Sequence, residues 1–383
     1  SRHPSYSCYP SCYRFMMIMD PVILASGTAL IGFLCGIILY RGDYCMVAML
    51  RDFFLIRDTT LLRSFVLYFL VTSLLFHVGG RTGMLPFQPP PTFAPASAAT
   101  LAGGLLFGIG IVLAGGCVVG TLYKMAGGSL VNWIGFAGIL AGSLLYAEIH
   151  PQVRSFSAQT TFTTSVTVAQ HHPALQTLFL AVLLAPCLAA IWRWTVSGKF
   201  QVTGHARGYI QPWKTAVFLA LLNVFYYFLA GYPMGITTAY AKIGAYLEQM
   251  ILPDHVANLA YFQNDSISFW TGGVLVSGGA GPRIDHISYT QLTLIVGIFA
   301  GALAAAVYYR EFRIHGLPPR RQGIAALTGG ILLALGARIA TGCNLNFLLG
   351  GLPLLAWQGF FFSGAMIAGM WIGTQILTRH VIK

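Results

Sequence analysis

The chain has 383 residues, of which 56% are hydrophobic and only 8% are charged. Soluble domains carry about 25% charged residues, so this composition excludes a cytosolic enzyme, a secreted disulfide-bonded domain and a disordered tail, and it indicates an integral membrane protein. The formal net charge of +12 would suggest a nucleic-acid partner for a soluble protein. In a membrane protein the cytoplasmic loops retain Lys and Arg, so we expect membrane lipid around the chain and no nucleic-acid partner.

Residues 1–15 contain no apolar core and no hydrophobic period, and Met16 follows them directly. We expect this leader to be an artefact or disordered and exclude it from the fold. Residues 16–383 are expected to form a single transmembrane transport domain.

Long apolar runs bounded by charged residues or by Pro and Gly clusters predict nine membrane-spanning helices, and hence an all-α polytopic membrane protein. A tenth run, at 266–281, is short and rich in glycine, and we expect it to form an ordered helix in a loop. The predicted spans are residues 21–40, 62–79, 97–115, 129–147, 174–194, 214–231, 288–309, 322–340 and 354–377.

The charges of the loops predict the orientation of these spans. With the N-terminus outside, the cytoplasmic segments hold thirteen Lys and Arg residues and the outer segments hold six. Positive residues accumulate on the cytoplasmic side of a membrane. We therefore expect the N-terminus outside and the C-terminus in the cytoplasm.

An internal repeat relates two distant parts of the chain. When Cys117 is placed on Cys343, residues 105–128 resemble residues 332–351, and Gly116 falls on Gly342. A weaker match places Thr238 where Cys45 stands; residues 40–49 then lie on residues 233–242.

The repeat divides the chain into two halves, 21–147 and 214–377, joined by a single connecting helix at 174–194. One intervening crossing makes the second half start on the opposite side of the membrane, which predicts an inverted-topology repeat with an hourglass-like shape. Close packing of helices through small residues is the alternative explanation of the glycine-rich segments.

Each half contains two interruptions of its apolar pattern. In hydrocarbon, irregular backbone is tolerated only where it is buried in protein or lines a wet cavity, so we expect short re-entrant helices there, lining the substrate path. The N-terminus of a broken helix favours an anionic substrate. The four breaks are residues 42–49, 115–128, 235–248 and 342–351.

Three of the four breaks hold a cysteine, namely Cys45, Cys117 and Cys343. A neutral thiol combines a weak S–H donor with a polarizable sulfur atom, which suits a soft, sulfur-bearing anion better than a metal cation. Cys35 and Cys187 lie within continuous spans and are expected to be packing residues. The seven cysteines show no C-x-x-C and no Cys/His ligand spacing, so we expect no metal site.

Lys124, Lys242 and Arg338 lie near the breaks and have no acidic neighbour in the sequence. A charge at the bilayer centre is costly without a partner, so a substrate anion supplies the countercharge or the side chains extend to an interface. Asn344 and Thr238 can hydrogen-bond the substrate or close the broken helices, and we favour the substrate.

Three motifs resemble the YeeE/YedE family of bacterial sulfur-compound transporters: Gly-Gly-Cys at 115–117, Thr-Gly-Cys-Asn at 341–344 and Arg-Gly-Asp-Tyr-Cys at 41–45. The resemblance covers essentially the whole chain from Met16. It implies thiosulfate uptake across the bacterial inner membrane through an hourglass-shaped protein of nine spans with short re-entrant helices. It also implies that thiols at the constrictions relay the anion, a role that falls on Cys45, Cys117 and Cys343.

Thiosulfate uptake is therefore the predicted function, with substrate-binding residues Cys45, Cys117, Cys343, Gly116, Gly342, Lys124, Thr238, Asn344 and Arg338. The alternatives are transport of a selenium compound or another small sulfur anion, and a membrane sulfur-transferase with a thiol nucleophile. The transferase needs a base beside the thiol, and no break contains a histidine. We expect no cofactor, because no nucleotide-binding motif is present; the sequence leaves open whether a small cytoplasmic sulfur-carrier protein is a partner.

Overall fold

The computed structural model describes residues 20–85, 89–171, 173–202, 204, 208–271, 274–314 and 316–381, so the leader at 1–15 lies outside the described residues. Within the described part, nine helices are long and apolar enough to cross a membrane, and each overlaps one of the predicted spans. The chain is an all-α polytopic membrane protein, as the sequence predicts.

In chain order the helices and strands are α2 (Pro21–Gly42), α3 (Met46–Ile56), α4 (Thr60–Arg81), α5 (Ala98–Leu113), α6 (Val118–Ala126), α7 (Leu130–Gln159), α8 (Val168–His171), α9 (Pro173–Val196), α10 (Pro212–Ala230), α11 (Thr237–Gln249), α12 (Pro253–Asn258), α13 (Ala260–Gln263), β1 (Asp265–Thr271), β2 (Val274–Gly279), η1 (Ser288–Leu292), α14 (Thr293–Tyr308), α15 (Arg320–Ile339), α16 (Asn344–Asn346), η2 (Phe347–Gly351), α17 (Trp357–Ile376) and η3 (Leu377–Val381).

The run at 266–281 is a β-hairpin, so the prediction of a helix there was wrong. Strand β1 pairs antiparallel with β2. Ile267 and Phe269 are buried, and they alternate with the exposed residues Ser266, Ser268 and Trp270, which is the period of two expected of a strand with one covered face. The glycine content of the run obscured this alternation.

Short helices fill the four predicted breaks. Helix α3 begins directly after Cys45, α6 after Cys117 and α16, which continues into η2, after Cys343. The fourth, α11, begins after Ile236. When the starts of α3 and α11 are aligned, Ile236 is the residue equivalent to Cys45. The sequence match had placed Thr238, two residues later, at this position.

The repeated segments meet along α5 and α15. A Cβ atom added to Gly103 would lie 2.6 Å from the backbone nitrogen of Ala340, and one added to Gly329 would lie 2.4 Å from that of Ala114. When Cys117 is aligned with Cys343, Gly103 corresponds to Gly329 and Ala114 to Ala340. The two contacts are therefore equivalent contacts of the two halves. Each joins the beginning of one helix to the end of the other, so the two equivalent spans run antiparallel. Such a pair crosses a membrane in opposite directions, as an inverted repeat requires.

The other packed helix pairs are also related to each other by the repeat. Helix α2 packs along α14 while α10 packs along α4, and α7 packs along α15 while α17 packs along α5. Glycines permit these close approaches: a Cβ added to Gly36 would lie 2.2 Å from a carbonyl oxygen of α14, and one added to Gly108 would lie 2.2 Å from a carbonyl oxygen of α17. Small-residue packing and the repeat thus occur together.

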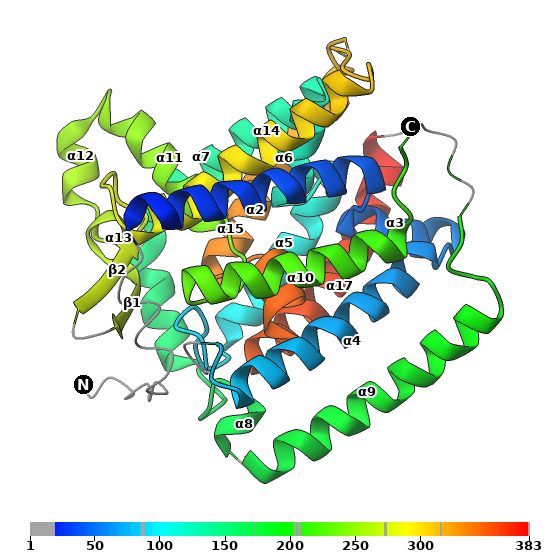
Figure 1. Cartoon of the computed structure of the whole chain (residues 1–383). Coiled ribbons are helices and arrows are strands. Elements are labelled where there is room, and N and C mark those ends of the chain that lie inside the picture. Colours follow the sequence, from blue (N-terminus) through cyan, green and yellow to red (C-terminus); the bar gives the residue numbers. More distant parts are fainter. Residues whose placement is uncertain are drawn as a thin grey trace.

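The connecting helix α9 lies at the edge of the bundle beside α4 (Figure 1). The β-hairpin, α12 and α13 gather at one end of the bundle, which we call the hairpin end, and α3 lies toward the opposite end (Figure 1). Helices α6, α11 and η2 lie inside the bundle, because most of their residues are buried, whereas α3 is buried only in its first half.

Candidate functional site

A narrow cavity of about 40 Å³, the thiol cavity, lies among the short helices α3, α6 and α16. Cys117, Gly120 and Asn344 line it together with apolar and aromatic side chains. A space of this size holds roughly three water molecules. A solute inside it therefore loses most of its hydration shell and depends on the side chains of the wall.

Two thiols converge on this cavity. A Cβ added to Gly120 would lie 3.3 Å from Sγ of Cys117 and 3.8 Å from Sγ of Cys45. The Cys117 sulfur accepts a hydrogen bond of 3.2 Å from the backbone N–H of Gly120, which leaves its S–H free to donate. The amide of Asn344 faces the same thiol from the other half of the repeat.

The third thiol, Cys343, lies between this cavity and a second one. Its side chain is completely buried. Gly342 and Asn346 line the second cavity, whereas Asn344 lines the thiol cavity, so the segment that carries Cys343 separates the two. Tyr240 lies beside the start of α6, because its hydroxyl donates a hydrogen bond of 2.7 Å to the carbonyl of Val118, the residue after Cys117.

The second cavity, at the hairpin end, has a volume of about 350 Å³ and is more polar. We call it the hairpin-side cavity. Its wall comes from the loop at 91–94, α7, the start of α11, α13, β1, η1 and the segment from the end of α15 to α16, so segments that are far apart in the sequence build it together.

Arg338 is the buried cation of the hairpin-side cavity, with 6% of its surface exposed. Its guanidinium donates to the hydroxyls of Thr238 at 3.1 Å and Tyr261 at 3.0 Å, and also to Thr237. Its Nε has no hydrogen-bond partner. Within the described part of the chain no carboxylate forms an ion pair with it.

The residues predicted from the sequence fall into three groups. Cys117 and Asn344 line the thiol cavity, and Thr238, Arg338 and Gly342 line the hairpin-side cavity. Cys45 and Cys343 adjoin these cavities, as described above. Gly116 and Lys124 are on neither wall.

Lys124 and Lys242 have partners that the sequence did not indicate. Lys124 donates a hydrogen bond of 2.8 Å to the carbonyl of Gly115 and so closes its own break. Lys242 is fully buried and lies 2.9 Å from a carboxylate oxygen of Asp285. An anionic substrate is therefore not needed as the countercharge of Lys242.

Sequence reasoning missed several residues of the cavity walls. Tyr146, His150 and Arg154 line the hairpin-side cavity from α7, and their spacing of four residues places them on one helical face. That periodicity was available in the sequence, but the predicted span ended at residue 147, before His150 and Arg154. Cys35, expected to be a packing residue, lines the thiol cavity.

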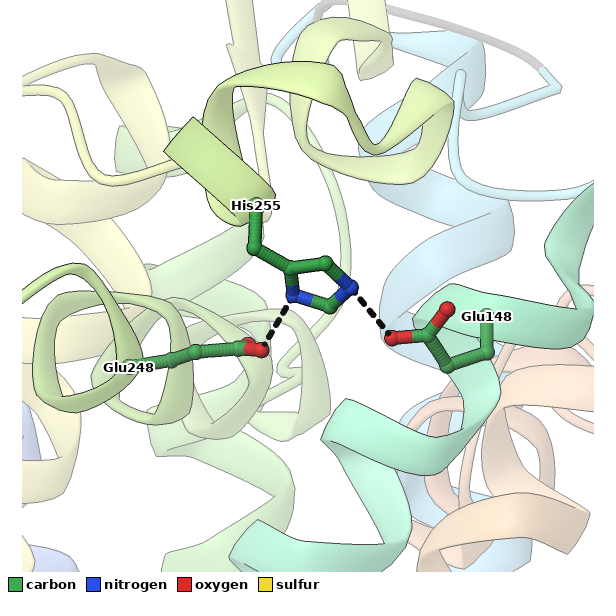
Figure 2. Close-up of side chains that lie close together, drawn as sticks. All are labelled: Glu148, Glu248 and His255. Atoms are coloured by element: carbon green, nitrogen blue, oxygen red, sulfur yellow. Dashed lines mark hydrogen bonds and ion pairs between the residues drawn. The ribbon is translucent and has the colours of Figure 1, made fainter. Parts of the chain in front are cut away.

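A further cluster joins three helices at the hairpin end. Figure 2 shows His255 of α12 between Glu248 of α11 and Glu148 of α7. Its Nδ1 lies 2.8 Å from Glu248 and its Nε2 lies 3.1 Å from Glu148. The ligand atoms are close enough together to share a metal ion. His255 already connects them through a hydrogen bond with Glu248 and an ion-pair contact with Glu148, and these contacts tie α12 to α7 and α11.

Comparison with known proteins gives the family. The model of the family described as sulphur transport matches residues 41–372. The chain belongs to this sulphur-transport family. The assignment confirms the YeeE/YedE resemblance of the three motifs, and the chain is a multi-pass membrane protein of a family that transports sulfur compounds.

Relatives match along most of the chain. It is 25% identical over 374 residues to the thiosulfate transporter TsuA of Escherichia coli K12, covering 95% of both proteins. It is 28% identical over 356 residues to TsuA of Spirochaeta thermophila, covering 92% of this chain and 98% of that one. The probable transporter YedE of Escherichia coli K12 is 26% identical over 172 residues, which is 45% of this chain and 39% of the relative.

Proposed function

We propose that this protein takes up thiosulfate across the bacterial inner membrane, from outside to the cytoplasm, and that thiols pass the anion along the path. The observation that carries the proposal is the position of three cysteines at the starts of three of the four short helices, around a cavity too small for a hydrated ion. Two relatives that match almost the whole chain are named thiosulfate transporters, which supports this substrate.

The proposed route has two stages. The anion enters the hairpin-side cavity, which is wide and polar, and then passes the segment of Cys343 into the thiol cavity near Cys117 and Cys45. Thiosulfate carries a soft terminal sulfur atom, and a neutral thiol offers it an S–H donor together with a polarizable surface. The N-terminus of α6 adds backbone N–H groups with a partial positive charge, which favours the anion.

The same wall argues for transport over sulfur transfer. A transferase needs a base beside its thiol nucleophile, and no histidine or carboxylate lines the thiol cavity among the described residues. Both TsuA relatives are named as transporters. We propose that the thiols act through reversible contacts, without a covalent adduct.

The test uses a bacterial host whose only sulfur source is thiosulfate and whose own uptake is deleted. Cys117→Ala and Cys343→Ala are expected to abolish growth and uptake of radiolabelled thiosulfate while the protein still reaches the membrane. Replacement by serine keeps the volume but exchanges the soft sulfur for a hard oxygen, and it should not restore uptake.

Cys187→Ala is the matched control, because Cys187 is a half-buried residue of α9 and lies on neither cavity wall. It should leave growth unchanged. Normal growth of both the Cys117 and the Cys343 variants would contradict the thiol relay.

The substrate needs its own measurement. Unlabelled thiosulfate, selenium-containing anions and other small sulfur anions are compared as competitors of labelled thiosulfate in vesicles. The proposal expects thiosulfate to compete at the lowest concentration. A selenium compound that competed at lower concentration and was itself accumulated would move the assignment to the alternative substrate.

A small cytoplasmic sulfur-carrier protein is the proposed recipient on the inner side. Vesicles that contain only this chain and transport thiosulfate at the cellular rate would show that such a carrier is not required.

A further inference from the structure

Two open grooves adjoin each other on the outside of the bundle. The first, which we call the α17 groove, has a volume of about 400 Å³ and follows one face of α17 into η3, from Trp371 to His380. The second, the α15 groove, has a volume of about 300 Å³ and follows α15 from Arg321 to Thr328. Ile376 and His380 line both grooves, so one molecule can occupy the two together.

Both grooves lie at the end of the bundle opposite the hairpin. Arg321 is at the start of α15, whereas Arg338, near the end of the same helix, lines the hairpin-side cavity. Helix η3, at the red end of the chain, also lies far from the hairpin (Figure 1). The orientation predicted from the loop charges places this end in the cytoplasmic leaflet, where anionic lipids attract basic segments that adjoin a membrane span.

The helix ends at these grooves carry positive charge. Arg321 lines the α15 groove, Arg379 lines the α17 groove, and His380 lines both. Among the described residues no carboxylate forms an ion pair with either arginine, and the sequence contains no Asp or Glu after Glu311. Arg321 also lies in the first turn of its helix, where a cation is unfavourable, so its charge does not stabilise α15. The grooves are therefore complementary in charge to an anion.

Away from the charged end, the walls are largely apolar. Ile324 follows Arg321 on one face of α15, and Thr328, at the far end, donates its hydroxyl to the carbonyl of Ile324. From Arg321 to Thr328 the groove runs about 10 Å along the helix. The α17 groove likewise leads from Arg379 to the indole of Trp371. A ligand that fits these walls has an anionic head and a hydrocarbon part, which describes a phospholipid and not a free phosphate ion.

We propose that the two grooves together bind one phospholipid with two phosphates, of the cardiolipin type. One phosphate lies at Arg321, the other at Arg379, and His380 lies between them. Arginine binds phosphate oxygens through charge-assisted hydrogen bonds, and the acyl chains extend along α15 and α17 toward the middle of the membrane. The bound lipid connects the start of α15 to η3. This site does not depend on which anion the chain transports.

The test measures lipid binding to the full chain by native mass spectrometry, after bound lipid has been removed in detergent. Cardiolipin, phosphatidylglycerol and phosphatidylcholine are added one at a time. Cardiolipin is expected to bind in one copy at the lowest concentration and to raise the thermal midpoint of the protein. Phosphatidylglycerol has a single phosphate and should bind about tenfold or more weakly. Glycerophosphate, which has the phosphate without acyl chains, should not displace cardiolipin.

The charges are tested with paired variants. Arg321→Gln combined with Arg379→Gln should weaken cardiolipin binding about tenfold or more, and both side chains are exposed, so the variant is expected to fold. Arg193→Gln combined with Lys199→Gln is the matched control, because it removes the same charge at exposed positions on neither groove. It should leave the affinity for cardiolipin unchanged.

The shape of the groove is tested without a change of charge. Thr328→Trp fills the far end of the α15 groove and should weaken cardiolipin binding severalfold. Leu327→Trp is the control, since Leu327 is exposed on the same helix but lines neither groove.

Four results would overturn the proposal. Cardiolipin that binds no better than phosphatidylcholine, or that binds the double arginine variant as it binds the wild type, would remove the site. Equal weakening by the two double variants would show attraction to surface charge in general, and displacement by glycerophosphate would show a site for soluble phosphate. Phosphatidylglycerol that binds as tightly as cardiolipin would contradict the assignment of two phosphates.

Discussion

Cys45 and Cys117 start two different short helices, yet their sulfur atoms lie 3.8 and 3.3 Å from the point where a single Cβ on Gly120 would stand. The absence of a side chain at Gly120 thus keeps open the space that the two thiols share. A side chain added at Gly120 is therefore expected to obstruct the path of the anion.

Gly120→Ala should slow thiosulfate uptake severalfold, because the added methyl group is in tight contact with Cys117 and fills part of a cavity of about 40 Å³. Gly120→Val should abolish uptake. Gly364→Ala is the control, since no atom lies within 4 Å of a Cβ added there. Initial uptake rates, normalised to the amount of protein in the membrane, provide the measurement, and equal rates for the two alanine variants would contradict the role of the shared space.

Gly336→Ala should destabilise the purified protein by about 1–3 kcal/mol or more, because overpacking forces two backbones apart. A Cβ added to Gly336 would lie 2.4 Å from the backbone nitrogen of Phe107, at the crossing of α5 and α15. Gly323→Ala, on the same helix, meets only side-chain atoms at 3.7 Å or more and should be neutral. Thermal unfolding of both variants checks this, and a neutral Gly336→Ala would argue against the close antiparallel crossing.

Lys242→Met should cost about 3–5 kcal/mol of stability, because it removes the ammonium partner at 2.9 Å from the largely buried Asp285 carboxylate, which keeps only Arg283 at 3.7 Å and backbone N–H donors. The ammonium group of Lys242 binds Asp285 and the carbonyls of Gly281 and Arg283, and it anchors α11 to the segment after the β-hairpin. The double variant with Asp285→Leu should lose less than the sum of the single changes. Unfolding in denaturant measures each, and additive losses would mean that the two side chains do not interact.

An exposed ion pair gives the contrast. Arg51→Met removes the partner of Asp52 at a position where both side chains are partly exposed, and surface pairs contribute about 0–1 kcal/mol. A loss as large as that of Lys242→Met would show that burial is not what makes the Lys242 pair important.

The orientation is tested by labelling exposed positions at the two ends. Met250 at the end of α11 and Leu317 before α15 are 82% and 85% exposed. In a background without Cys8, Cys12 and Cys187, a membrane-impermeant maleimide should label Met250→Cys in intact spheroplasts and Leu317→Cys only after lysis. The opposite pattern would reverse the proposed direction of uptake.

The sequence was sufficient to predict the spans and the breaks, because long apolar runs and their glycine-rich interruptions are local signals. The match of Cys117 on Cys343 also gave the register of the repeat, and the contacts of Gly103 and Gly329 agree with that register. The β-hairpin was missed, since its short alternation was weaker than the glycine content of the run.

The cavity walls were less accessible to sequence reasoning. Arg338 meets Thr238 and Tyr261 only after α11, α13 and α15 have packed together, and no spacing along the chain records that meeting. Lys242 likewise finds Asp285 across a connection that contains the hairpin. A charged residue without an acidic neighbour in the sequence can therefore have an ion-pair partner in the fold. That Lys242 has such a partner and Arg338 has none among the described residues depends on tertiary contacts.

The proposed transport mechanism requires that the thiols of the two inverted halves line the path of the anion. An experimental structure of the protein soaked or vitrified with thiosulfate tests it most directly, with anomalous or difference density locating the sulfur atoms. The account predicts density for the anion between Cys343 and Cys117, with its terminal sulfur against a thiol. Density on a route that avoids all three cysteines, with their side chains facing lipid, would contradict it.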